Sequence, residues 1–219
     1  MKNILSISAV VMLLSLGCAM SSQTVRLDDR SVKGHVEQAH QHRLKAKEHR
    51  DQYSPRARLE SDSLELDQVR YTPEVYNPTQ WHRHEADREL DLARQHEEAA
   101  GELARFEEDE CRLFPPKTRG QCPLLGSVKS VESIKNGVRV ELYDGISQDA
   151  VLAHSRCHIA FGMEKGREGM PGCPLYVKGV QGSKSADGHA LEFTGETPET
   201  VKEIRSRFAG HVGGGYDDH

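Results

Sequence analysis

The stretch NGVRVEL, residues 136–142, decides the fold of the C-terminal half of this chain. Asparagine followed by glycine favours a tight turn, because both residues tolerate a positive φ. After the turn, apolar and polar residues alternate, which is typical of a strand with one buried face and one solvated face. The stretch DGHALEF, residues 187–193, repeats this arrangement at an offset of 51 residues. We therefore predict two hairpins, one around each turn.

The same offset relates other parts of the chain. The tripeptide Cys-Pro-Leu at residues 122–124 recurs at residues 173–175. A helix start follows each hairpin, at Ser147 and at Thr197, because serine and threonine cap helices and a proline after the cap favours the first helical turn. These signals predict helices over residues 150–161 and 201–212.

The predicted fold class is α+β, with a two-layer domain over residues 111–212. Each unit of the repeat, residues 122–161 and 173–212, consists of strand, turn, strand and helix. Two units give the order ββαββα, in which a four-stranded antiparallel sheet carries both helices on one face. The alternative is a chance similarity between two cysteines and two common turns. Residues 213–219 are expected to form a disordered tail.

The N-terminal half predicts a helical arm over residues 31–110. Ser31 is a candidate cap for a helix from Val32 to Tyr53, and the clearest helical periodicity extends from Gln80 to Arg112. Two helices joined across a proline-bounded connection pair most simply as an antiparallel hairpin or a coiled-coil-like arm. Between them we expect a shorter helical segment at residues 56–69 and a loop at residues 71–79.

Small apolar residues line the inner face expected for each helix of the arm. Because alanine buries little area, the arm should need a further partner, which could be another helix, a second copy or the compact domain. The expected stripes are Val32, Ala39, Ala46 and Tyr53 in the first helix, and Ala86, Leu90, Ala93, Ala100, Leu103 and Ala104 in the second.

Five histidines of the arm are candidate metal ligands. In a hairpin the edge of the first stripe would face the second helix, and facing imidazoles can bind Zn²⁺ or Cu²⁺. Such imidazoles would also repel one another when they protonate near about pH 6. The alternative is that histidine acts as a small polar filler between the helices. The candidates are His35, His42, His49, His82 and His96.

His154 and His158 form a second candidate metal pair. They lie four residues apart on an expected helix, a spacing that can place two imidazoles on one ion. The sequence indicates no third ligand for them. The alternative is that both histidines lie at the boundary of the helix's buried face.

The first eighteen residues predict where the chain resides. Lys2 precedes an apolar run at residues 4–16, which is too short to span a membrane and is typical of a secretory signal. The residues LSLGC, 14–18, resemble the lipobox of bacterial lipoproteins. This resemblance implies cleavage before Cys18 and a diacylglyceryl group on its sulfur. The alternative is an ordinary secreted protein in which Cys18 is removed or stays a free thiol.

The lipobox resemblance also sets the expected segments before the arm. Residues 1–17 would be the removed signal peptide, and residues 18–30 would be the lipidated cysteine with a flexible tether. No acidic residue follows Cys18 directly, which in lipoproteins implies the outer membrane rather than the inner one. Several acyl chains on one terminus would anchor the chain stably, whereas a single chain binds only marginally.

Cysteine usage fits an oxidising compartment. The chain has five cysteines, and setting Cys18 aside leaves an even number. These four allow three connectivities. The shortest loops predict that Cys111 pairs with Cys122 and that Cys157 pairs with Cys173.

Composition and motifs narrow the class of function. A formal net charge of −5 argues against a basic surface that would attract nucleic acid, and the common hydrolase, phosphate-loop and zinc-protease motifs do not occur. We expect a membrane-anchored envelope lipoprotein, non-enzymatic and without a cofactor, whose arm contacts an envelope protein or a second copy. The alternative is a periplasmic Zn- or Cu-binding protein that uses the arm histidines. A third hypothesis is an enzyme whose site residues are scattered along the sequence.

Overall fold

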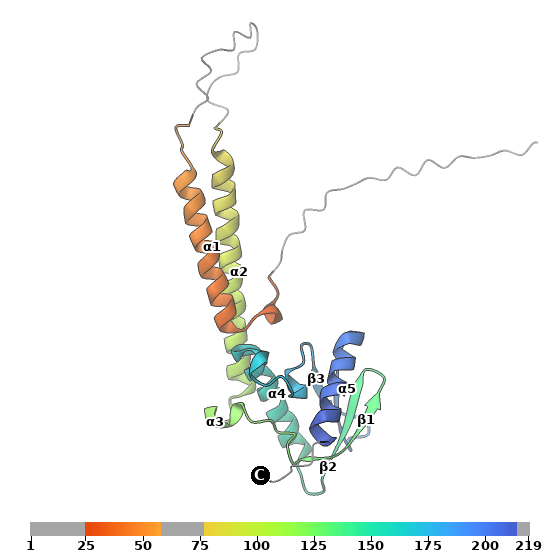
Figure 1. The fold of residues 1–219 in the computed structure, drawn as a ribbon. Coiled ribbons are helices and arrows are strands. Elements are labelled where there is room, and N and C mark those ends of the chain that lie inside the picture. The colour runs from red at the N-terminus through yellow and green to blue at the C-terminus, as the bar shows by residue number, and fades with distance from the viewer. Residues whose placement is uncertain (1–24, 58–76, 214–219) are drawn as a thin grey trace, which may run out of the picture.

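The structure, a computed structural model, describes residues 25–57 and 77–213, which form a helical arm and a compact α+β domain (Figure 1). The predicted signal peptide, Cys18, the first part of the tether and nearly all of the segments expected at residues 56–69 and 71–79 lie outside the described residues. So does the predicted tail after residue 213. Within the described ranges, every helix is too short or too polar to cross a bilayer.

Two helices form the arm, and they pair as the predicted antiparallel hairpin (Figure 1). Helix α1 spans Val32–Gln52 and helix α2 spans Gln80–Glu110. The Ser31 hydroxyl accepts a hydrogen bond from the Gly34 amide and caps α1, as its sequence predicts. Beyond the start of α1, α2 continues and packs against helix α4 of the compact domain.

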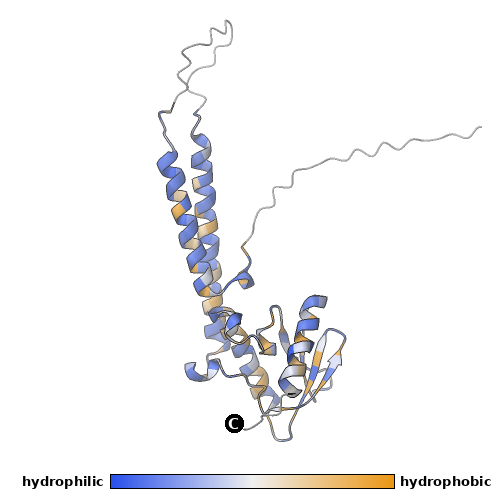
Figure 2. Ribbon diagram, viewed as in Figure 1, coloured by the Kyte–Doolittle hydropathy of each residue, from blue (hydrophilic) through white to orange (hydrophobic). Residues whose placement is uncertain are grey.

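The seam, meaning the buried line of contact between α1 and α2, repeats every seven residues. In α2 the buried positions alternate by threes and fours, which is the spacing of a coiled coil. Ala104, predicted in the stripe, is exposed, because the heptad spacing passes from Leu103 to Glu107 instead. The buried residues are His35, Ala39 and Ala46 in α1, and Ala86, Glu89, Ala93, His96, Ala99, Ala100, Leu103 and Glu107 in α2. Figure 2 shows that the residues of the arm are mostly hydrophilic, whereas the compact domain carries more hydrophobic ones.

The N-terminal segment, residues 25–30, is not the flexible tether that the sequence predicted. It forms a 3₁₀ turn at Leu27–Asp29 and contacts the compact domain. Asp28 pairs with Arg167, and the Asp29 carboxylate lies 2.8 Å from the Lys178 ammonium. The polar sequence of this segment has no pattern that predicts these contacts, because their partners lie more than a hundred residues away along the chain. The chain therefore enters the arm beside the compact domain.

The compact domain confirms the predicted order ββαββα. Its sheet has the strand order β1-β2-β4-β3, and all three pairs of neighbours are antiparallel. Both long helices begin directly after the predicted caps, Ser147 and Thr197, and therefore a little earlier than the predicted ranges 150–161 and 201–212. The elements are α3 (Pro116–Arg119), β1 (Val128–Ile134), β2 (Gly137–Leu142), α4 (Gln148–Lys165), β3 (Gln181–Lys184), β4 (Leu191–Thr194) and α5 (Pro198–Gly213).

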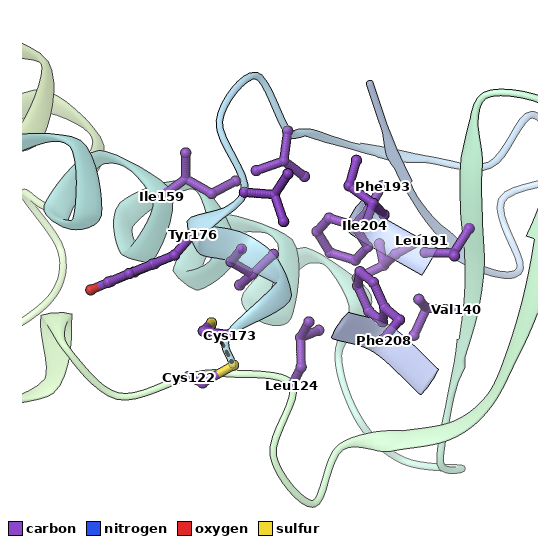
Figure 3. Close-up of a cluster of buried hydrophobic side chains, with 14 of the residues drawn as sticks. Cys122, Leu124, Val140, Ile159, Cys173, Tyr176, Leu191, Phe193, Ile204 and Phe208 are labelled. Carbon is purple, nitrogen blue, oxygen red and sulfur yellow. Dashed lines mark hydrogen bonds between the residues drawn. The ribbon is translucent and has the colours of Figure 1, made fainter. Parts of the chain in front are cut away.

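One face of the sheet carries the core. In the central strands Val138 pairs with Phe193 and Val140 pairs with Leu191, and all four side chains are buried. Leu152 of α4 and both Ile204 and Phe208 of α5 belong to the same buried cluster (Figure 3). The alternate residues Arg139 and Glu192 point to the other face and are partly exposed. Both helices therefore cover one face, as the alternation predicts.

The two turn glycines have different roles. Gly188 has a φ of +73°, which is the turn conformation that the sequence predicted. Gly137 instead begins β2, and a side chain there would collide with the adjacent strand, because an added Cβ would lie 1.9 Å from the Phe193 carbonyl oxygen. Close approach of two strands, rather than a positive φ, requires glycine at residue 137.

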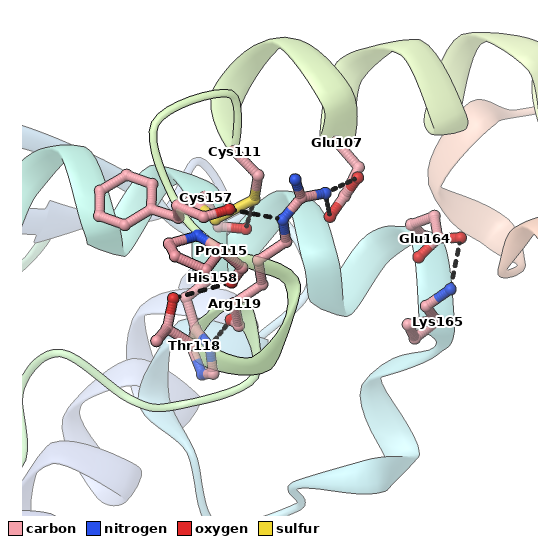
Figure 4. A network of polar contacts seen from close by, with 10 residues as sticks. Glu107, Cys111, Pro115, Thr118, Arg119, Cys157, His158, Glu164 and Lys165 are labelled. Atoms are coloured by element: carbon pink, nitrogen blue, oxygen red, sulfur yellow. Dashed lines mark hydrogen bonds and ion pairs between the residues drawn. A yellow bond between two sulfur atoms is a disulfide. The ribbon is translucent and has the colours of Figure 1, made fainter.

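A disulfide joins the arm to the compact domain, and it corrects the predicted pairing. Cys111 at the end of α2 bonds Cys157 of α4 (Figure 4). The predicted pairs of Cys111 with Cys122 and of Cys157 with Cys173 are therefore wrong. The shortest-loop argument considers only the chain between cysteines, whereas here the packing of α2 on α4 brings two distant cysteines together, with a Cα–Cα distance of 4.6 Å.

Candidate functional site

Two thiols and one imidazole meet at Cys122, Cys173 and His158, and His211 of α5 borders them at Cys122; we call these four residues the thiol–imidazole cluster. The sulfurs of Cys122 and Cys173 lie 3.7 Å apart without a bond between them. The His158 Nε2 atom lies 3.4 Å from the Cys173 sulfur, and the His211 Nε2 atom lies 3.5 Å from the Cys122 sulfur. Cys122, Cys173 and His158 are buried, and His211 is partly buried.

The two Cys-Pro-Leu tripeptides place the sulfurs face to face (Figure 3). Cys173 precedes the 3₁₀ turn Pro174–Tyr176, in which proline occupies the first position. The backbone amides of Leu124 and Leu175, each two residues after a cysteine, act to lower the pKa of that thiol. A nearby amide stabilises a thiolate, so the repeated tripeptide gives both sulfurs one feature in common.

The orientation of His158 is set by the backbone. Its Nδ1–H donates to the Arg119 carbonyl oxygen at 2.9 Å, since a carbonyl can only accept. In the neutral ring Nε2 then carries the lone pair, and this atom faces Cys173. Arg119 is in turn held by Glu107 of α2 through two hydrogen bonds of 2.8 and 3.0 Å (Figure 4). The base of the arm therefore supports the cluster.

The two thiols of the cluster differ in acidity. The hydrogen bond between the sulfurs, followed by the contact with His158, lowers the pKa of Cys173 to about 5. The same hydrogen bond, together with burial and the negative charge on Cys173, raises the pKa of Cys122 above its ordinary value. Burial is also the main reason that the pKa of nearby Tyr176 rises to about 12. The pair therefore favours one thiolate at neutral pH.

The predicted histidines of the arm meet as layers across the seam. The Nδ1 atoms of His35 and His96 are 2.9 Å apart, and those of His49 and His82 are 3.1 Å apart. Between these layers, His42 Nδ1 lies 2.6 Å from a carboxylate oxygen of Glu89. Successive layers are seven residues apart in both helices. They run forward along α1 and backward along α2, because the helices are antiparallel.

These layers bring the arm histidines together in pairs rather than in larger sets. Over residues 25–57 and 77–213, the one set of three or more His, Cys, Asp or Glu ligand atoms within 4.8 Å of one another is Cys122, His158 and Cys173. Each arm pair can supply two ligands to an ion, so further ligands would have to come from solvent.

His154 and His158 do not face a common point. The Nε2 atom of His154 hydrogen bonds to the Thr118 carbonyl oxygen at 3.1 Å, and its ring stacks on Phe114. The candidate pairing of these two histidines on one metal ion is therefore wrong, because His154 Nε2 is directed to the Thr118 carbonyl oxygen and His158 Nε2 to the Cys173 sulfur. His158 contributes instead to the thiol–imidazole cluster.

The prediction missed three members of the cluster as possible ligands: Cys122, Cys173 and His211. Both cysteines are predicted to form disulfides, and the sequence predicts no role for His211. A usable signal was present in the repeat, because each unit contains one Cys-Pro-Leu and, a similar interval later, a histidine in its long helix, although the helix of the first unit also carries His154.

Comparisons of this chain with protein-family models, with curated proteins and with solved structures give no match. Function is therefore argued from the residues and their geometry alone.

Proposed function

We propose that this chain is a membrane-anchored lipoprotein of the cell envelope, with a non-enzymatic role in which the helical arm binds an envelope protein. The lipobox-like residues 14–18 support the anchor. One structural observation carries the role of the arm: both of its ends lie at the compact domain, so the hairpin projects from the domain (Figure 1).

The N-terminal segment lies beside the compact domain, which determines where a lipid anchor on the chain would hold that domain. Six residues lie between Cys18 and Val25, and an extended chain spans at most about 25 Å over that interval. A lipid on Cys18 would therefore keep the compact domain near the membrane surface. The hairpin, whose shorter helix is about 30 Å long, would be free to extend toward a partner.

The end of the arm far from the domain offers a suitable contact residue. Trp81, near the start of α2, is 54% exposed, and its ring stacks on His82. Tryptophan contributes disproportionately to protein interfaces because it buries a large area with little loss of side-chain entropy. Along the rest of the arm, exposed ion pairs within each helix keep the surface hydrated, as for Lys47 with Asp51.

Site-specific photocrosslinking in intact cells tests the role of the arm. A photoreactive residue at exposed Arg83, next to Trp81, should form an adduct with a defined envelope protein, and the added substitution Trp81→Ala should weaken it. The matched control is exposed Tyr143 of the compact domain, which should give no such adduct. Equal labelling from both positions, or an adduct of two copies of this chain, would overturn the proposal.

The anchor is tested separately. The variant Cys18→Ser should lose the acyl chains and leave the detergent phase for the aqueous phase after phase separation. If the variant partitions like the parent chain, the proposed lipidation is wrong.

A second candidate function is the binding of a transition metal ion, which the sequence analysis ascribed to the arm histidines. The close Nδ1 atoms of His35 and His96, and of His49 and His82, support it only in part, since each pair is two ligands. The variant His35→Gln/His49→Gln tests this function. It should lower the zinc content of the purified chain if the arm holds an ion.

A further inference from the structure

We propose that Cys122, Cys173, His158 and His211 bind one Zn²⁺ ion in a closed structural site that joins the two units of the repeat. This site is distinct from the arm histidines and independent of the proposed function. It rests on four observations: the distances between ligand atoms, the groups around them, their burial and their distribution over the repeat.

For Cys122, Cys173 and His158 the distances match tetrahedral zinc, and His211, whose Nε2 atom lies outside this set of three, would move toward it when the ion binds. Zn–S bonds of about 2.3 Å and Zn–N bonds of about 2.0–2.1 Å place two sulfurs about 3.8 Å apart, and a sulfur and a nitrogen about 3.6 Å apart. The measured separations are 3.7 Å between the sulfurs of Cys122 and Cys173, and 3.4 Å between that of Cys173 and His158 Nε2. His211 Nε2 approaches the Cys122 sulfur to 3.5 Å from the opposite helix. A disulfide, in contrast, needs about 2.05 Å between sulfurs.

Hydrogen bonding by a neighbouring backbone group gives His158 the orientation that a zinc ligand needs. Zinc binds thiolate and neutral imidazole, and a ligating histidine almost always donates its second N–H to a carbonyl or carboxylate. His158 does so toward the Arg119 carbonyl.

The burial of these residues favours a ligand set whose negative charge cancels the positive charge of the ion. Two thiolates compensate the charge of Zn²⁺, so the loaded site is neutral and loses little on desolvation. Cys122 and Cys173 are no more than 6% exposed, and His158 is fully buried. Four protein ligands in such an environment leave no position for substrate, which is the arrangement of a structural rather than a catalytic zinc.

The distribution of ligands explains what the ion would hold together. The first unit supplies Cys122 and His158, and the second supplies Cys173 and His211, so each unit gives one sulfur and one nitrogen. His158 belongs to α4 and His211 to α5. The ion would link the two helices on the covered face of the sheet, whereas the disulfide links α4 to the arm.

Metal analysis of the full chain, purified in detergent without a polyhistidine tag, tests the site. We expect about one zinc per chain that survives dialysis. Replacement by Co²⁺ should give the visible absorption of a tetrahedral ion and a thiolate-to-metal charge-transfer band. His158→Gln and His211→Gln should each weaken zinc binding more than about 100-fold, beyond the usual effect of changing a neighbour of a ligand.

The matched controls change histidines outside the site. His154→Gln lies on the same helix as His158, and His35→Gln/His49→Gln lies in the arm; both should keep the tightly bound ion and the Co²⁺ spectrum. If His211→Gln binds zinc like the parent chain, the assignment of the fourth ligand is overturned.

Thiol counting in the unchanged chain avoids variants that fail to fold. After chelation and denaturation without reductant, Cys122 and Cys173 should react as two free thiols per chain. A Cys122–Cys173 disulfide found by peptide mapping of the chain isolated from the envelope would overturn the site. So would a zinc content unaffected by Cys122→Ser/Cys173→Ser.

Discussion

Asp28 pairs with Arg167, so the residues just before the arm are held against the turn that follows α4. The two side chains are separated by 139 residues and are each only about a quarter exposed. This contact, with that of Asp29 and Lys178, determines where the chain enters the arm.

Breaking this contact should release the N-terminal segment without unfolding the chain. We expect Asp28→Asn to lower the free energy of unfolding by at most about 1 kcal/mol, since partly exposed ion pairs contribute little. Amide hydrogen exchange at residues 25–30 should nevertheless become faster. Arg167→Gln should have the same effect, and the double variant should add nothing to either. Additive effects would mean that the two residues act independently.

The arm should lose stability in acid. Burial, followed by the positive charges of His35, His42 and Arg30, lowers the pKa of His96 from 6.5. The unfolded chain therefore binds a proton more readily than the folded one, and stability falls as the pH decreases through the unfolded pKa. Thermal unfolding followed by helical circular dichroism should show a lower Tm at pH 5.5 than at pH 7.5.

Comparison with His96→Gln isolates this effect, because glutamine keeps a polar partner for His35 but does not titrate. The variant should show a smaller decrease in Tm between these pH values, whereas His154→Gln should behave like the parent chain. Identical decreases in all three chains would exclude His96 as the source.

Two glycine substitutions should have opposite effects. Gly137→Ala places a methyl group against the Phe193 carbonyl and should destabilise the domain by about 1–3 kcal/mol. Gly101→Ala has no atom within 4 Å of the added carbon and lies in the interior of α2, so it should stabilise the chain by about 0.5–1 kcal/mol. Urea denaturation of both variants measures the difference, and a stable Gly137→Ala chain would mean that β2 and β4 are less closely paired.

Loss of the disulfide should be costly. The bond between Cys111 and Cys157 closes a loop of 46 residues, for which the chain-entropy relation gives about 4 kcal/mol. Cys111→Ser/Cys157→Ser should therefore lower the Tm markedly, and reductant should lower the Tm of the parent chain but not of the variant. Peptide mapping that finds Cys111 joined to Cys122 would contradict the pairing.

Much of the compact domain follows from local signals. The turn dipeptides, the alternation in residues 138–142 and the helix caps each act over a few residues, and together they predict the ββαββα order that the structure confirms. The hairpin follows for the same reason, from helical periodicity and a proline-bounded connection.

Features that depend on contacts between distant residues could not be predicted in this way. The partner of Cys111 is determined by the packing of α2 on α4, and Asp28 contacts Arg167, which lies 139 residues away along the chain. The meeting of Cys122 with His211 requires both units of the repeat to be folded. The order of these residues along the sequence does not determine the distances between their side chains in the folded chain.

The alternation of alanine with polar residues along the seam has a consequence for how the two helices are aligned. A slip of α1 by one turn would move His35, His42 and His49 opposite alanines and leave buried imidazoles without partners, at a cost in free energy. A seam of leucines would hold more tightly but tolerate such a slip. Like the single buried asparagine of a coiled coil, the polar layers exchange stability for a unique register. The alignment of the hairpin is thus encoded in its own side chains, independently of the residues that connect the helices.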